Sequence, residues 1–125
     1  VFETCQAIWN AMSGEFLTVP SCQDEWIAVA ADCDRLWNYP NCIGAIDGKN
    51  CSIQCPPNTG SEYFNYKKFF SVVLLGVCDA NYKFIYVDVG TAGRWSDGGT
   101  FDTCSLNQAM TIDSLNIPAP RNLLG

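Results

Sequence analysis

The stretch FFSVVLLGVCDANYKFIYVDVG, residues 69–90, decides the fold. Residues 69–78 are almost continuously apolar, which is typical of a strand whose two faces are both buried. Asp79-Ala80-Asn81 supplies turn-forming residues, and residues 82–90 read as an antiparallel partner strand. The sequence therefore predicts a central pair of strands joined by a tight turn.

A further strand is predicted on the N-terminal side of this pair. The stretch CIGAIDG places a short apolar run, residues 42–46, directly before Asp47 and Gly48. Residues 51–55 are a candidate continuation of this strand past a bend at Gly48. A buried, unpaired carboxylate costs several kcal/mol. Asp47 is therefore expected either to lie in water at the strand end or to have a cationic partner.

Helical periodicity is found on both sides of the strands. It predicts helices over residues 2–13, 23–38 and 100–113. The residues expected on the apolar sides of the first two are Cys5, Ile8, Trp9 and Met12, and then Trp26, Val29, Ala30, Cys33, Leu36 and Trp37. The order of two helices, three meandering strands and a crossover helix predicts an α/β fold. A crossover helix needs a following strand, so the sheet is expected to be unfinished.

Composition limits the function classes. The 125 residues have a net charge of −6, so binding to DNA by bulk positive charge is excluded. Metal ions or another protein would have to supply that charge. No apolar run approaches the roughly 18 residues of a membrane helix, so no membrane association is expected.

Eight cysteines leave two interpretations open. Cys33, Cys42 and Cys78 lie in apolar patterns, where free cysteine behaves as a small hydrophobe, and this favours reduced thiols in an intracellular protein. The alternative is a secreted, disulfide-bridged structural domain. Zinc is disfavoured because the sequence has no histidine and no Cys-x-x-Cys.

Four linked motifs carry a family resemblance. They are WNYPNCIGAIDGKN, then IQCPPNTGSEYFNYKKFFSVVLLGVCDANYKFIYVDVG, then GRWSDGGTF and finally LNIPAPRNLLG. In this order they resemble the PIF/Harbinger transposase-derived nucleases of the DDE superfamily, over about residues 36–125. The resemblance implies a ribonuclease-H-like fold in which acidic residues hold Mg²⁺ or Mn²⁺ for DNA cleavage. It also implies a nuclear protein that acts with a separate, Myb-like DNA-binding partner.

The resemblance assigns two site residues. Asp47 matches the family's first catalytic and metal-binding Asp, and Asp97 matches the acidic residue of the motif after the third strand. The family's next Asp and its Glu have no counterpart in this sequence, so this chain alone is expected to be inactive. Asn50 and Ser96 stand where many members have His. The implied organisation is an N-terminal helical segment, residues 1–41, and the N-terminal part of a nuclease domain, residues 42–125.

Residue chemistry suits this assignment but leaves simpler interpretations open. A strand is a rigid mount for Asp47, and Gly48 would leave room for substrate backbone. Asp47 could equally be an ordinary strand-end residue, and Asp97 a turn residue or helix cap. Lys67, Lys68 and Arg94 are candidates for phosphate contacts or simply solvated cations.

Three functions follow from these observations. The first is a divalent-metal-dependent DNA endonuclease or transposase-derived domain, incomplete in this chain. The second is a catalytically inactive, domesticated derivative that acts as a protein-binding module. The third, from a different class, is the secreted cysteine-rich structural domain.

Overall fold

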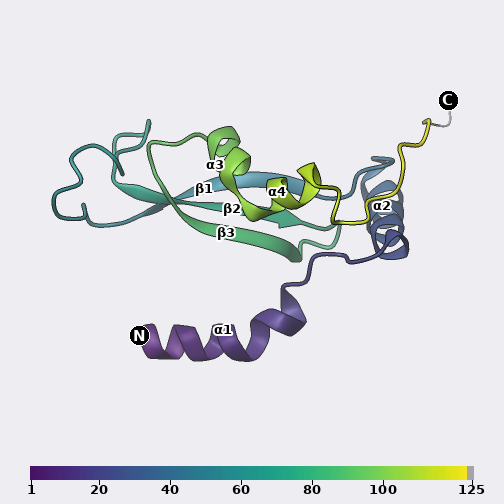
Figure 1. Ribbon diagram of the computed structural model, residues 1–125, viewed down its shortest axis with the longest axis horizontal. Helices are drawn as coiled ribbons and strands as arrows, with labels where there is room; N and C mark the ends of the chain where they lie inside the picture. The colour runs from purple at the N-terminus through teal and green to yellow at the C-terminus, as the bar shows by residue number, and fades with distance from the viewer. Residues whose placement is uncertain (124–125) are drawn as a thin grey trace. The chain divides into compact units, whose positions relative to one another are not determined.

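The computed structural model describes residues 1–123 and has a mixed α/β fold (Figure 1). Its elements in chain order are α1 (Phe2–Phe16), α2 (Gln23–Trp37), β1 (Ala45–Ser52), β2 (Ser71–Cys78), β3 (Phe84–Ala92), α3 (Asp97–Thr103) and α4 (Ser105–Thr111). The strands form one antiparallel sheet in the order β1-β2-β3. The α/β class is confirmed, and the meander followed by helix is consistent with the opening part of a ribonuclease-H-like fold.

The chain divides into two compact units. Unit 1 contains Val1–Ala45, Val77–Tyr86 and the described part of Leu115–Gly125. Unit 2 contains Ile46–Gly76 and Val87–Ser114. All three strands contribute residues to both units, β1 through its first residue, Ala45. The sequence-based boundary between residues 41 and 42 stays a prediction, and residues 124–125 of the predicted nuclease segment lie outside the described residues.

Unit 2 is built on the apolar part of β2. Val73 and Leu75 alternate along the strand and are almost completely buried. Ala92 at the end of β3, Cys104 and Leu106 are buried as well. These side chains form the apolar core of the unit that holds both predicted acidic site residues.

Unit 1 is centred on α2, whose tryptophans bond to distant parts of the chain. The Trp26 indole Nε1 donates to the Leu115 carbonyl at 2.7 Å, and Trp37 Nε1 donates to the Ala80 carbonyl at 2.9 Å. Of the expected apolar side of α2, Trp26 and Cys33 are buried, but Leu36 and Trp37 are exposed. α2 therefore packs through a narrower face than its periodicity predicts.

The first helix differs more strongly from expectation. α1 buries no residue, and its predicted apolar side chains Ile8, Trp9 and Met12 are all exposed. Its existence over 15 residues agrees with the pattern. The periodicity therefore predicts the helix correctly, but the apolar side that it predicts is not buried in unit 1.

The first strand was predicted too early and with a bend. It begins at Ala45 and runs through Gly48 without interruption. Gly44 lies before it with φ of +150°, and a Cβ there would come within 2.9 Å of Val77 Cγ1. This close approach and unusual backbone explain why residues 42–44 stay outside the strand.

The third predicted helix is two short helices. Cys104 has extended backbone (φ −74°, ψ 157°), which interrupts the helical hydrogen bonds. Its Sγ accepts from the Asn107 amide at 3.4 Å, so it caps the start of α4. α3 starts earlier than predicted because Ser96 Oγ accepts from the Gly99 amide at 3.1 Å.

Two further observations concern the alternatives raised by the sequence. All eight cysteines are free thiols. Within residues 1–123, no helix combines the length and the apolar character that crossing a membrane requires.

Candidate metal centre

Asp47 lies in the middle of β1 with an exposed side chain. Its Oδ1 accepts a hydrogen bond from the amide of Gly48 at 2.9 Å, so the carboxylate folds back over its own strand. No ion pair to Asp47 is formed within residues 1–123. The carboxylate is exposed but lies within the strand rather than at its end.

Asp97 approaches β1 at Gly48. It is the first residue of α3, directly after the capping residue Ser96. Its carboxylate packs so closely on Gly48 that a Cβ at that position would overlap it. Both residues therefore lie next to Gly48 but on different sides of the strand: Asp97 covers the face to which position 48 points, whereas Asp47, one residue earlier, starts from the opposite face and bonds to the Gly48 amide.

This arrangement gives Gly48 a different role from the one expected. The space beside its α-carbon is filled by Asp97 and is not left for substrate backbone. The sequence analysis missed this contact. A glycine inside a strand is a known signal of close approach, and it was the available clue.

The donor set suits a hard divalent cation but is small. Both side chains are exposed carboxylates without an ion-pair partner in the described chain, and carboxylate oxygens are the ligands that Mg²⁺ prefers. No group of three or more acidic, cysteine or histidine side chains within residues 1–123 is arranged to hold a metal ion. Asp47 and Asp97 are therefore two separate candidate oxygen ligands next to Gly48.

Comparison with known proteins places this geometry in a family. Residues 46–124 match the family model described as DDE superfamily endonuclease. The chain belongs to the DDE superfamily endonucleases. No curated protein and no solved structure matches it significantly. The matched stretch includes all of unit 2, and with it both carboxylates.

The predicted cationic residues of this endonuclease-family chain lie in loops of unit 2. Lys67 Nζ is 5.5 Å from the ring centre of Tyr66, and the Arg94 guanidinium is 5.6 Å from that of Trp95. Lys68 has a left-handed backbone with φ of 68°. Arg94 is in the loop that leads to Asp97, whereas Lys67 and Lys68 lie between β1 and β2. None of the three forms an ion pair with a described residue, so their charges face solvent.

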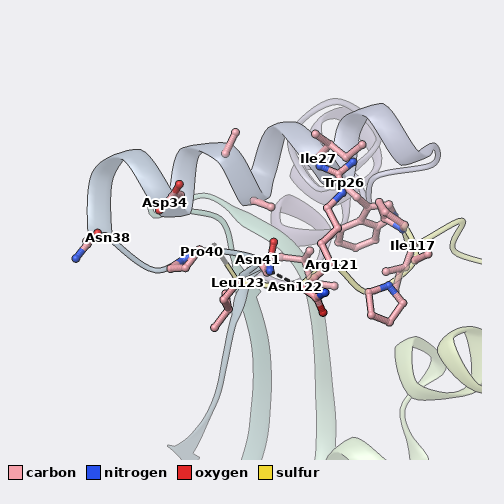
Figure 2. A pocket seen from close by; sticks show the side chains of 16 residues that line it. Trp26, Ile27, Asp34, Asn38, Pro40, Asn41, Ile117, Arg121, Asn122 and Leu123 are labelled. Atoms are coloured by element: carbon pink, nitrogen blue, oxygen red, sulfur yellow. Dashed lines mark hydrogen bonds between the residues drawn. The ribbon is translucent and has the colours of Figure 1, made fainter. Parts of the chain in front are cut away.

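A pocket of about 700 Å³ lies in unit 1 (Figure 2). It is lined by one side of α2 and by the chain from Ile117 to Leu123. Asn41, in the segment after α2 that also lines the pocket, donates from Nδ2 to the Arg121 carbonyl at 3.2 Å. The pocket contains neither Asp47 nor Asp97, and it is not the site that the motifs predict.

Proposed function

We propose that this chain supplies part of the catalytic centre of a divalent-metal-dependent DNA endonuclease of the PIF/Harbinger, transposase-derived type. The supporting observation is that the stretch matching the family contains both Asp47 and Asp97, each of which lies next to Gly48. Asp47 and Asp97 are the proposed catalytic and metal-binding residues, with Mg²⁺ or Mn²⁺ as cofactor. Bound ions of this kind stabilise charge on phosphate oxygens and lower the pKa of the attacking water.

The chain's own contribution is two oxygen-donor side chains on fixed supports. Asp47 is mounted on β1, and Asp97 is held at the start of a capped helix against that strand. Two carboxylates leave most of the coordination of two metal ions to water and to other groups. Further carboxylates from outside this pair are therefore part of the proposal.

DNA binding would need more positive charge than this chain carries. A net charge of −6 repels phosphates at long range. Lys67, Lys68 and Arg94 are the proposed local phosphate contacts, because their charges are not neutralised within the described chain. A separate DNA-binding partner and a nuclear location belong to the proposal through the family resemblance.

Metal binding by the two carboxylates is the direct test. Calorimetry with Mn²⁺ should give a dissociation constant on the order of millimolar for the 125-residue chain, because the ligand set is partial. Asp47→Asn and Asp97→Asn should each weaken binding, whereas Asp102→Asn, an exposed acidic residue on α3, should not. If Asp47→Asn left the Mn²⁺ affinity unchanged, the result would favour the inactive, protein-binding derivative.

The close packing of the Asp97 carboxylate on Gly48 offers a second test, in which both carboxylates stay in the chain. Gly48→Ala should push the Asp97 carboxylate away, since the new methyl group would occupy its place. We expect Mn²⁺ affinity to fall as far as it does in Asp97→Asn. Gly98→Ala is the matched control, because a Cβ at Gly98 has its nearest neighbour at 3.9 Å.

Cleavage is expected to require more than this chain. With only two carboxylates at the site, the purified 125-residue chain should not nick supercoiled plasmid in Mg²⁺ or Mn²⁺. Nicking that disappears in Asp47→Ala would contradict the requirement for further ligands.

A further inference from the structure

The start of β2 carries a completely buried serine that bonds in four directions. Ser71 is 0% exposed. Its amide donates to the Tyr63 carbonyl at 2.8 Å, and its carbonyl accepts from the Gly93 amide at 2.9 Å. Its hydroxyl accepts from Asn65 Nδ2 at 2.8 Å and donates to Asn50 Oδ1 at 2.8 Å. We call Ser71, Asn65 and Asn50 the serine cluster.

Ser71 and its partners join three segments: β1, the chain between β1 and β2, and the loop that leads to Asp97. Asn50 is on β1, two residues after Gly48, and so lies on the same face of the strand as the position that Asp97 covers. Gly93 opens the loop that carries Asp97, and a Cβ at Gly93 would overlap Ser71 Oγ. The chain between β1 and β2 is held through Asn65, whose Oδ1 accepts from the amides of Lys67 and Phe69.

A buried polar group is costly unless it is fully hydrogen-bonded, and an apolar residue would be the simpler choice in a core strand. Val73, the next residue on the same face, shows that choice and is also 0% exposed. At Ser71 every polar atom has a partner: Asn50 is on the strand bearing Asp47, Gly93 is in the loop leading to Asp97, and Tyr63 and Asn65 are in the chain between β1 and β2. The hydroxyl therefore holds β1 through Asn50 and the chain between β1 and β2 through Asn65, while the Asp97 loop is bonded to the backbone carbonyl of Ser71 and packs on the hydroxyl at Gly93.

We infer that Ser71 is a positioning residue for the proposed metal ligand Asp97: through Asn50 and Gly93 it fixes the Asp97 loop against β1, so that Asp97 packs on Gly48. The role as a metal ligand rests on the proposed function. The positioning itself does not, because the contact between Asp97 and Gly48 is present in the chain alone.

The test measures that contact without metal. In the wild type, NMR should show a nuclear Overhauser effect between Gly48 Hα and Asp97 Hβ. Ser71→Ala should reduce it at least about threefold, whereas Val73→Ala, a buried substitution on the same face of β2, should leave it unchanged. If Ser71→Ala does not fold, Asn50→Ala removes one arm of the cluster from a half-buried position, with Cys51→Ala as its neighbour control.

A Mn²⁺ titration on the same samples separates the proposed metal binding from the positioning role of Ser71. Wild-type amides of Asp47, Gly48 and Asp97 should broaden first, and Ser71→Ala should need about tenfold more Mn²⁺ for equal broadening, as for other groups that support metal ligands. Absence of that broadening in the wild type would refute the metal function. The nuclear Overhauser effect between Gly48 and Asp97 would still test whether Ser71 positions Asp97. An unchanged effect in Ser71→Ala, or an equal loss in Val73→Ala, would overturn the inference.

Discussion

In unit 1 the hydrogen bonds that join distant segments are single and separate, whereas in unit 2 they converge on one serine. Trp26 reaches Leu115, and Trp37 reaches Ala80, each through one indole N–H. In unit 2, Ser71 alone connects four other residues. Separate bonds allow one segment to shift without the next, but a shared centre couples them. The unit that carries the two carboxylates is the coupled one.

The largest effect should come from the apolar core on which the coupled unit is built. Leu75 is 1% exposed in the middle of β2, so Leu75→Ala should lower the free energy of unfolding by about 2–5 kcal/mol. Trp9→Ala removes a larger side chain, but Trp9 is 52% exposed on α1 and should cost within about 0.5 kcal/mol. Urea denaturation measures both. A larger loss for Trp9→Ala would show that α1 packs on a surface that it does not contact here.

The sequence predicts the strands of unit 2 well because their signal is local. An apolar run, a turn and a second run specify β2 and β3 within two residues at each end. The run does not reveal that Leu75 is fully buried and Leu74 only half-buried, since both faces read as apolar. That difference depends on what covers each face, which is a tertiary property.

The candidate site is predictable in its residues but not in its contacts. The motifs point to Asp47 and Asp97, and the structure packs Asp97 on Gly48, the residue after Asp47, while their metal-binding role stays a prediction. The serine cluster has no local signal, because Asn50, Asn65 and Ser71 are each ordinary polar residues in sequence. Only the pairing of β1 with β2 and the path of two loops make them neighbours.

A smaller effect should come from the separate bonds of unit 1. Trp26→Phe removes the indole donor and leaves the Leu115 carbonyl without it, and Trp26 is buried, so we expect a loss of about 1–3 kcal/mol. Trp37→Phe should cost less because Trp37 is exposed and water can replace its bond to Ala80.

Chemical denaturation of the two single variants and the double variant tests whether the bonds are separate. The two losses should add within about 0.5 kcal/mol if they are. A coupling energy well above that value would mean that unit 1 is held cooperatively, as unit 2 is, and the contrast between the units would fail.

The smallest effect is a pH dependence confined to unit 1. Burial, with a smaller contribution from a hydrogen bond with Cys42, raises the pKa of the Cys33 thiol from 9.0 to about 11. The folded state therefore keeps the proton that the unfolded state loses first, so this contribution is complete below pH 9 and declines as the pH rises toward 11. From pH 8 to pH 10 the free energy of unfolding should fall by about 1 kcal/mol through this group.

Cys33→Val isolates that contribution, because it fills the same buried position of α2 without an ionisable group. The loss of stability between pH 8 and pH 10 should be smaller in Cys33→Val than in the wild type by about 1 kcal/mol, whatever lysines and tyrosines contribute to both. Urea denaturation of the two proteins at each pH gives this difference directly. Parallel pH profiles would show that the thiol reaches solvent in the folded state, and that unit 1 opens around α2 more readily than the burial of Cys33 indicates.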